Sequence, residues 1–221
     1  MSIKNELAKI LGKDYVSDKK EDLAEYAHDY SLLPPGMPDT VVWPGNTQEV
    51  GKVVTWCNEK NIPVVPVSSK VHFHGSTIPK QGGVVVDLKR MNNILEIDLD
   101  NRLARVEAGV TWDQFVSELE KKGMRTIMPL LPPGDRSVVT DTLEREVPTN
   151  VVYDYGEPTQ SIEVVWPNGE AFRCGSASVN GFPESKSRGA NPSGPGLDFY
   201  RFFQLAQGTM GIVTWASLKI E

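Results

Sequence analysis

Three loops of the sequence join predicted core elements but carry residues that a core does not need. The first, at 67–76, follows an apolar segment, and its small residues can direct backbone N–H groups toward a phosphate. The second, at 131–142, begins with a Leu-Pro-Pro-Gly-Asp-Arg run, and the third, at 207–211, is a Gln-Gly-Thr-Met-Gly turn. The glycines of that turn let a flat ligand approach the backbone. We therefore expect the binding chemistry of this chain at these loops.

Two histidines, His72 and His74, lie in the first loop. Imidazole is a common metal ligand, but this His-x-His pair has no obvious third ligand, and His28 is remote in sequence. We therefore expect no metal site. The two side chains are expected either to hydrogen-bond a phosphate or the backbone, or to face solvent.

The sequence lacks the two commonest nucleotide-binding motifs. No Gly-x-Gly-x-x-Gly follows a predicted strand, which argues against a doubly wound dinucleotide-binding sheet. No Gly-x-x-x-x-Gly-Lys-Ser/Thr run occurs either, which argues against a P-loop nucleotide site.

The composition narrows the classes of partner. The 221 residues carry 23 Lys and Arg against 29 Asp and Glu, a formal net charge of −6, which argues against a nucleic-acid or anionic-membrane partner. Two cysteines, Cys57 and Cys174, are too few for a disulfide framework, and the helical spacing around Cys57 predicts a core position. No apolar stretch approaches the roughly 18–20 residues that span a bilayer, and the N-terminus lacks an apolar signal segment. We expect a cytoplasmic protein.

Five helices are expected to position the loops. Ser2 can cap the first and Gly12 can close it, a second covers 18–28, and Thr47 starts a third. Thr111 caps a fourth that ends at Gly123, and a short fifth helix covers 200–205. The predicted strands are 40–43, 62–67, 84–88, 94–98, 103–108, 162–166, 171–174 and 212–220.

The connections between the later strands differ in kind. The turn at 99–102 makes a hairpin, and Asn-Gly at 168–169 favours a type I′ hairpin turn. An irregular stretch is expected from 128 to 156, and a Gly/Pro/Ser-rich loop from 175 to 196. Continuous apolar strands mixed with alternating hairpins predict an α+β fold. We expect one domain, 1–221, with mixed sheets in two lobes at about 1–95 and 96–221.

Several segments occur in an order that carries a family resemblance. They are Pro-Val-Val-Pro at 63–66, Gly-Val-Val-Val-Asp-Leu-Lys-Arg-Met-Asn at 83–92, Val-Glu-Ala-Gly-Val-Thr-Trp at 106–112, Ser-Val-Val at 137–139 with Leu-Glu-Arg at 143–145, and Gln-Gly-Thr-Met-Gly-Ile-Val-Thr at 207–214. From residue 40 onward the chain resembles the PCMH-type FAD-binding domain. This is the flavoprotein superfamily of vanillyl-alcohol oxidase and p-cresol methylhydroxylase, which also includes glycolate and D-lactate dehydrogenases.

The resemblance implies a binding mode and a set of contacts. FAD would lie extended and noncovalently bound between the two lobes, with its pyrophosphate on the first loop and its adenosine and flavin portions held by the other two. The implied cofactor-binding residues are Pro66, Val67, Ser68, Ser69, Lys70, Val71, His72, Gly75, Ser76, Pro133, Gly134, Asp135, Ser137, Val138, Thr140, Asp141, Gly208, Gly211, Ile212 and Val213.

The resemblance also implies a catalytic candidate. Glu157 resembles an acidic residue near the flavin in the aryl-alcohol branch, where the acid would assist proton transfer or flavin reduction. The alternative is a solvated loop carboxylate.

The implied function is an FAD-dependent oxidoreductase acting on a small alcohol or hydroxy acid. Family enzymes continue into a substrate domain that caps the flavin; we expect that domain to be absent from this chain and a partner subunit to supply the cap. Two departures keep other functions open: the first loop is poor in glycine, and Asp141 would repel a pyrophosphate. The alternatives are a flavin-free scaffold or binding subunit that retains the fold, and a flavin electron-transfer subunit of a larger complex.

Overall fold

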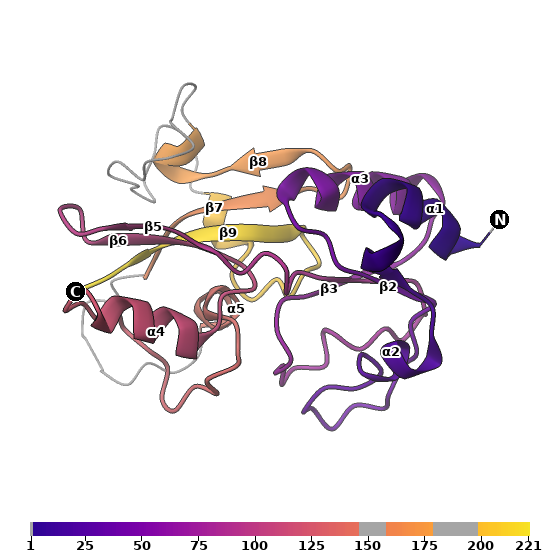
Figure 1. The fold of residues 1–221 in the computed structure, drawn as a ribbon, viewed down its shortest axis with the longest axis horizontal. Coiled ribbons are helices and arrows are strands. Elements are labelled where there is room, and N and C mark those ends of the chain that lie inside the picture. The colour runs from indigo at the N-terminus through magenta and orange to yellow at the C-terminus, as the bar shows by residue number, and fades with distance from the viewer. Residues whose placement is uncertain (1, 146–157, 179–198) are drawn as a thin grey trace.

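The computed structural model describes residues 2–145, 158–178 and 199–221, which form two β-sheets with helices on their faces (Figure 1). Sheet A has the strand order β1-β2-β4-β3, and sheet B has the order β5-β6-β9-β7-β8. The strands of sheet A are β1 (Val16–Ser17), β2 (Thr40–Val42), β3 (Val64–Val67) and β4 (Val84–Asp87). The strands of sheet B are β5 (Ile94–Asp98), β6 (Leu103–Glu107), β7 (Thr159–Val165), β8 (Ala171–Arg173) and β9 (Ile212–Lys219). Both strands and helices occur throughout, which confirms the α+β class.

Sheet A is buried on both faces. Its central strand β4 pairs in parallel with β2 and with β3, while β1 adds an antiparallel edge. Val84 and Val86 face α1 (Ile3–Leu11) and α3 (Thr47–Glu59), whereas Val85 faces the side of α2 (Lys20–Ala24). Because alternate side chains of a strand point to opposite faces, a strand covered on both sides must be apolar throughout, which explains the valine run of β4.

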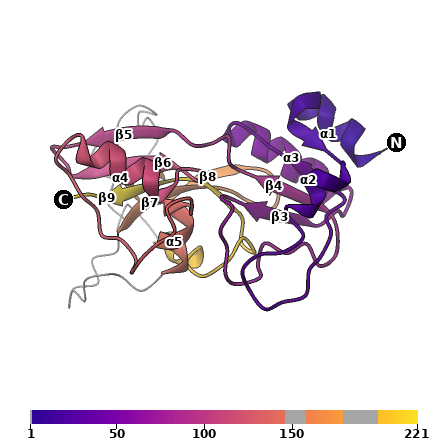
Figure 2. The ribbon, with the colours of Figure 1, turned by 60° about the horizontal axis from the view of Figure 1, so that its bottom comes forward.

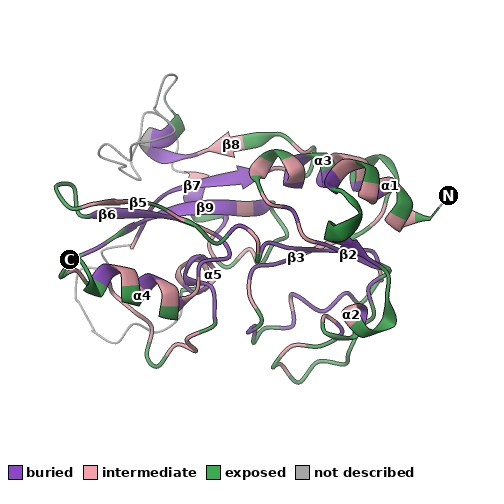
Figure 3. Ribbon diagram, in the orientation of Figure 1, coloured by how far each residue is buried: buried purple, intermediate pink, exposed green. Residues whose placement is uncertain are grey.

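Sheet B is antiparallel, and one of its faces carries α4 (Trp112–Glu120) and α5 (Val138–Glu144). Phe115 and Leu119 of α4 pack with Ala216 and Leu218 of β9 in one core. Figure 3 shows β7 and β9 as largely buried strands. The N-terminus lies at the sheet A end of the molecule and the C-terminus at the sheet B end (Figures 1 and 2).

The two sheets share apolar packing where they meet. Val165 and Ile212 at the ends of β7 and β9, together with Ala108, belong to the same buried cluster as α1, α3 and β4. The chain passes from sheet A to sheet B between Asp87 and Ile94, so the expected lobe boundary at 95/96 falls inside β5. The single-domain assignment and its boundaries stay a prediction.

The helix caps follow the sequence signals closely. The Ser2 side chain accepts a hydrogen bond from the Asn5 amide at the start of α1, and Thr111 does the same for Gln114 in α4. Helix α3 begins at Thr47, as expected, and Asn46 caps it, because the Asn46 Oδ1 atom accepts from the Glu49 amide at 2.9 Å. These side chains satisfy amides that have no partner within the helix.

Three expectations need correction. Helix α2 is shorter than 18–28, because Lys20–Ala24 alone forms α-helical turns. The stretch 128–156, expected to be irregular, contains α5 at Val138–Glu144; the Ser137 hydroxyl caps it, with the Thr140 amide 3.1 Å away. The short helix expected at 200–205 is a 3-10 turn, Phe199–Phe202.

The β7–β8 turn also differs from its prediction. Gly169 alone has a positive φ there, +85°, whereas a type I′ turn requires one at Asn168 as well. The Gly169 amide donates to the Trp166 carbonyl, and the Trp166 amide donates to the Glu170 carbonyl. This is a type I turn closed by a left-handed glycine, a geometry that suits Pro167 because proline favours the second position of type I turns.

Two further observations concern burial and membranes. Cys57 is fully buried, as its spacing predicts, and burial raises the pKa of its thiol to about 12. Among the described residues, no helix has the length and apolar character needed to cross a bilayer.

Candidate cofactor site

A cleft lies between the two sheets, where the loop after β3, helix α5 and the segment before β9 meet. We use two names for its parts. The narrow cleft is the part beside α5, and the wide chamber is the space that continues past the loop after β3. The narrow cleft holds about 90 Å³ and the wide chamber about 720 Å³, and Val67, Ser68, His72 and Thr77 line both. The narrow cleft is also lined by Pro66, Ser76, Leu88, Ala108, Val139, Thr140, Leu143, Glu144, Phe203, Leu205, Ala206, Gln207, Gly208, Gly211, Ile212 and Val213.

The first loop supplies donors that could hold a phosphate. Within the described ranges, the backbone N–H groups of Ser69, Lys70 and Val71 donate no hydrogen bond to another residue. The Ser69 hydroxyl oxygen is buried and also has no partner there. Ser69 and the exposed Lys70 line the wide chamber. Unpaired amides, a hydroxyl and one ammonium group form a donor set that suits a diphosphate, so these residues fit the pyrophosphate of a dinucleotide cofactor.

The opposite end of this loop is held by Asp29. Its carboxylate accepts a hydrogen bond from the Gly75 amide at 2.7 Å and another from the Ser31 amide at 2.8 Å. Burial alone would raise the pKa of Asp29, but these hydrogen bonds lower it below its ordinary value. The Tyr30 amide adds a hydrogen bond to the His72 carbonyl at 2.9 Å. The loop is thereby ordered by the segment that follows α2.

His72 lies buried where the narrow cleft and the wide chamber meet. Its Nε2 atom is 2.9 Å from the Ser69 carbonyl oxygen, so the ring donates from Nε2. Burial, with a smaller contribution from the nearby Arg136, lowers the pKa of His72 to about 4, although the Ser69 hydrogen bond opposes the shift. His72 is therefore neutral at pH 7 and orders the loop without adding charge. His74 is half exposed, and its Nε2 atom is 3.5 Å from the Glu144 carboxylate.

Helix α5 forms the facing wall of the narrow cleft. The Ser137 hydroxyl donates to the Ala108 carbonyl at 2.6 Å, which fixes the start of the helix against sheet B. Across the cleft, the Ser68 and Thr140 hydroxyl oxygens are 2.5 Å apart, so one donates to the other. This contact joins the first loop to α5 directly.

Asp141 faces away from the cleft. Its side chain is fully buried and forms an ion pair with Arg136, and its other oxygen accepts a hydrogen bond from Trp112 Nε1 at 2.6 Å. The repulsion expected between Asp141 and a pyrophosphate is therefore offset by a buried guanidinium.

The segment before β9 closes the cleft. Gly208 has a φ of +81°, and a Cβ atom at that position would lie 2.4 Å from Pro66 Cγ. At Gly211 a Cβ atom would lie 2.7 Å from the Val165 carbonyl oxygen. Glycine is needed at both positions because the backbone passes directly against the end of β3 and against β7.

The predicted site residues divide into two groups. Those that line the narrow cleft or wide chamber are Pro66, Val67, Ser68, Ser69, Lys70, His72, Ser76, Asp135, Thr140, Gly208, Gly211, Ile212 and Val213. Those outside both linings are Val71, Gly75, Pro133, Gly134, Ser137, Val138 and Asp141. Glu157 lies outside the described residues. Among the described residues no cluster of three His, Cys, Asp or Glu side chains could hold a metal ion.

Several lining residues were not anticipated. Leu143 and Glu144 come from α5, and Phe203 and Leu205 come from the segment before Gly208. Ser137 as a cap, followed by apolar residues at 139 and 143, is a helix signal that could have been recognised. The valines and threonines that follow Ser137 weaken this helix signal, because such β-branched residues favour strands.

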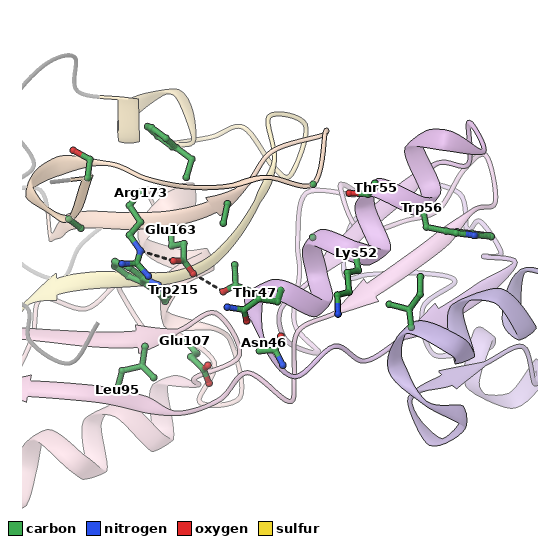
Figure 4. A pocket seen from close by; sticks show the side chains of 18 of the residues that line it. Asn46, Thr47, Lys52, Thr55, Trp56, Leu95, Glu107, Glu163, Arg173 and Trp215 are labelled. Atoms are coloured by element: carbon green, nitrogen blue, oxygen red, sulfur yellow. Dashed lines mark hydrogen bonds and ion pairs between the residues drawn. The ribbon is translucent and has the colours of Figure 1, made fainter. Parts of the chain in front are cut away.

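A separate, open groove of about 1310 Å³ lies against α3 and the strands of sheet B (Figure 4). Glu163 lines this groove and accepts hydrogen bonds from Thr47 Oγ1 at 2.6 Å and Arg173 Nε at 2.8 Å. The Arg173 guanidinium is 5.8 Å from the ring centroid of Trp215. This cluster joins α3 of the sheet A side to strands β7 and β8 of sheet B.

Comparison with known proteins decides the family. The model of the family described as FAD binding domain matches residues 38–175. The chain belongs to this family. Its cofactor is FAD, as the first-loop donor set allows.

Individual relatives agree with the FAD-binding domain assignment. Glycolate oxidase subunit GlcD of Bacillus subtilis (strain 168) is 31% identical over 228 residues, which cover 99% of this chain and 44% of that protein. The crystal structure of p-cresol methylhydroxylase with substrate bound aligns with a TM-score of 0.83 and 28% identity, covering 98% of this chain and 42% of that one. The 4-ethylphenol oxidase from Gulosibacter chungangensis, in its isoeugenol complex, aligns with a TM-score of 0.84 and 26% identity. The alignment covers 99% of this chain and 42% of that one.

These matches confirm the resemblance to the PCMH-type FAD-binding domain. The chain spans less than half the length of each of these relatives.

Proposed function

We propose that this chain is the FAD-holding part of a flavin-dependent oxidoreductase that oxidises a small alcohol or hydroxy acid. The observation that carries the proposal is the convergence of three distant segments on one cleft with unpaired amide donors. The relatives support the substrate class, because their names refer to glycolate, p-cresol and 4-ethylphenol.

The residues of the cleft would bind and orient the cofactor. The amides of Ser69 and Lys70 and the ammonium group of Lys70 would hold the pyrophosphate. Val139, Leu143 and Val213 would pack against its rings and exclude water. Bound FAD supplies the acceptor for the hydride that leaves the substrate, so the protein's role is to place the cofactor and shield it.

The test is a titration of the purified chain with FAD, followed by flavin fluorescence and thermal unfolding. We expect one FAD per chain and a higher Tm in its presence, because a ligand that binds only the folded state stabilises it. A colourless chain that takes up no added FAD and shows no change in Tm would contradict the proposal. Riboflavin, which has no phosphate, is the matched control and is expected to bind much more weakly.

One observation favours a second candidate, a flavin-free scaffold that retains the fold. The Ser68–Thr140 hydrogen bond closes the cleft at a point where only about 90 Å³ is open. FAD uptake at that point would require the two hydroxyls to separate. If the variant Ser68→Ala/Thr140→Ala binds FAD while the unmodified chain does not, the scaffold function is supported.

We also propose that a further domain or a partner subunit covers the cleft. Exposed apolar side chains surround it: Tyr30 is 71% exposed, Phe73 38% and Leu205 63%. Contiguous exposed apolar residues commonly mark interaction surfaces. The FAD-loaded chain alone is then expected to show no turnover with glycolate or p-cresol. Full turnover by the chain alone would contradict a covering partner and leave FAD binding intact.

A further inference from the structure

The largest fully buried side chain of the described residues carries a positive charge. Arg136 is 1% exposed and lies just before α5. Its Nε atom pairs with Asp141, and its Nη2 atom pairs with Glu144. These two carboxylates are three residues apart on α5 and so lie on one helix face, where the planar guanidinium can reach both.

The backbone around Arg136 holds this geometry in place. The Arg136 carbonyl accepts a hydrogen bond from the Trp112 amide at 3.1 Å, and its own amide donates to the Pro133 carbonyl at 3.0 Å. Trp112 Nε1 also holds Asp141. The guanidinium is therefore fixed between the start of α4 and the face of α5.

The cluster reaches the first loop through two adjacent side chains. The Arg136 guanidinium is 4.5 Å from the ring centroid of Phe73, and His74 Nε2 is 3.5 Å from the Glu144 carboxylate. The Tyr30 ring also lies near Phe73, with ring centroids 6.0 Å apart. One buried cation thus connects the two segments that form opposite walls of the narrow cleft.

The charges explain why this cation matters for an anionic ligand. Glu144 lines the narrow cleft and is 8% exposed at its side chain, and Asp141 lies directly behind that wall. Without Arg136, two carboxylates would stand in and directly behind the cleft wall that faces the first loop, with no guanidinium beside them. Coulomb repulsion is strong in such a water-poor setting because little solvent screens it.

We propose that Arg136 is a positioning residue for FAD: by neutralising Asp141 and Glu144 it keeps the α5 wall able to accept an anionic cofactor against the first loop. The inference rests on the proposed FAD-holding function. In this role Arg136 acts on the cofactor through Glu144 and Phe73, because Arg136 itself lines neither the narrow cleft nor the wide chamber.

The experiment compares FAD dissociation constants of three variants with that of the unmodified chain. Arg136→Met removes the guanidinium from both carboxylates, and we expect FAD binding to weaken at least about 30-fold. Glu144→Gln breaks the same ion pair but removes a negative charge from the cleft wall, so FAD should bind at least as tightly as in the unmodified chain. Arg136→Met/Asp141→Asn/Glu144→Gln should recover most of the lost affinity.

The difference in FAD affinity between Arg136→Met and Glu144→Gln is the decisive readout, because loss of a merely structural ion pair would weaken FAD binding in both variants. The matched control is Arg173→Met, which removes a guanidinium from the buried Glu163 outside the cleft and should change FAD affinity less than about 3-fold. Unfolding free energies measured in urea verify that each variant is folded.

Three results would overturn the inference: FAD affinity unchanged in Arg136→Met, Glu144→Gln as weak as Arg136→Met, or no recovery in the triple variant. If Arg136→Met does not fold, Glu144→Gln and the triple variant still decide. Failure of the unmodified chain to bind FAD is a separate outcome, which contradicts the proposed function itself.

Discussion

Thr47 Oγ1, in the first turn of α3, donates a hydrogen bond of 2.6 Å to Glu163 Oε1 of β7, which joins a helix packed on sheet A to a strand of sheet B. Glu163 is 5% exposed, and its Oε1 atom also accepts from Thr214 Oγ1 at 3.1 Å. This buried contact fixes the two sheets relative to each other on the side of the open groove.

Thr47→Val is expected to lower the free energy of unfolding by about 1–3 kcal/mol, because a buried carboxylate loses a donor. Urea denaturation measures the loss. Thr55→Val is the control, since the Thr55 hydroxyl makes a longer, exposed hydrogen bond of 3.2 Å to the Asn168 carbonyl. Equal losses of unfolding free energy in the two variants would show that the Thr47–Glu163 hydrogen bond stabilises the protein no more than an exposed hydrogen bond does.

The lowered pKa of His72 predicts that the free energy of unfolding depends on pH. Its pKa is lowered to about 4 in the fold from an ordinary 6.5, so between these values the unfolded chain binds a proton that the folded chain does not. The contribution of neutral His72 to the free energy of unfolding is fully present above pH 6.5. It is lost as the pH drops toward 4, which lowers the free energy of unfolding by about 3 kcal/mol in total. His72→Gln should lack this component in urea titrations at successive pH values. His28→Gln, at an exposed position, should keep it.

Gly208→Ala is expected to weaken FAD binding and lower Tm. The added Cβ atom would lie 2.4 Å from Pro66 Cγ, which forces the closing segment away from the first loop. Gly123→Ala is matched in backbone strain, with φ of +67°, but its Cβ atom would meet nothing within 4 Å. Fluorescence titration should therefore give a weaker FAD affinity for Gly208→Ala than for Gly123→Ala. Comparable affinities would mean that the close contact with Pro66 does not determine the shape of the cleft.

Tyr26→Phe is expected to cost about 1–3 kcal/mol of stability. The Tyr26 hydroxyl donates to Asp87 Oδ2 at 2.6 Å and accepts from Trp43 Nε1 at 3.1 Å, so its removal takes one hydrogen-bond partner from each of two part-buried polar groups. Burial, reinforced by Asp87, raises the pKa of Tyr26 well above its ordinary value. Thermal unfolding measures the loss, with Tyr30→Phe as the control because Tyr30 is 71% exposed. Equal Tm values for the two variants would contradict a role for this triad.

The sequence alone determined most of the strands and helices, although not α5, and it singled out the loops expected to carry binding residues. Caps such as Ser2 and Thr111 act over three residues, and the valine run of β4 records burial on both faces, so local patterns are sufficient to locate them. The first loop was recognisable for the same reason, because small and polar residues directly after an apolar strand are a local signal.

The tertiary structure alone decided which side chains face the cleft. Asp141 was expected beside the cofactor, but it pairs with Arg136 and Trp112, while Glu144, not anticipated, lines the wall. Ser68 meets Thr140 across 72 positions of sequence. Such pairings depend on how helices and loops pack, and buried charges must find partners wherever the fold brings them, which no short-range pattern encodes.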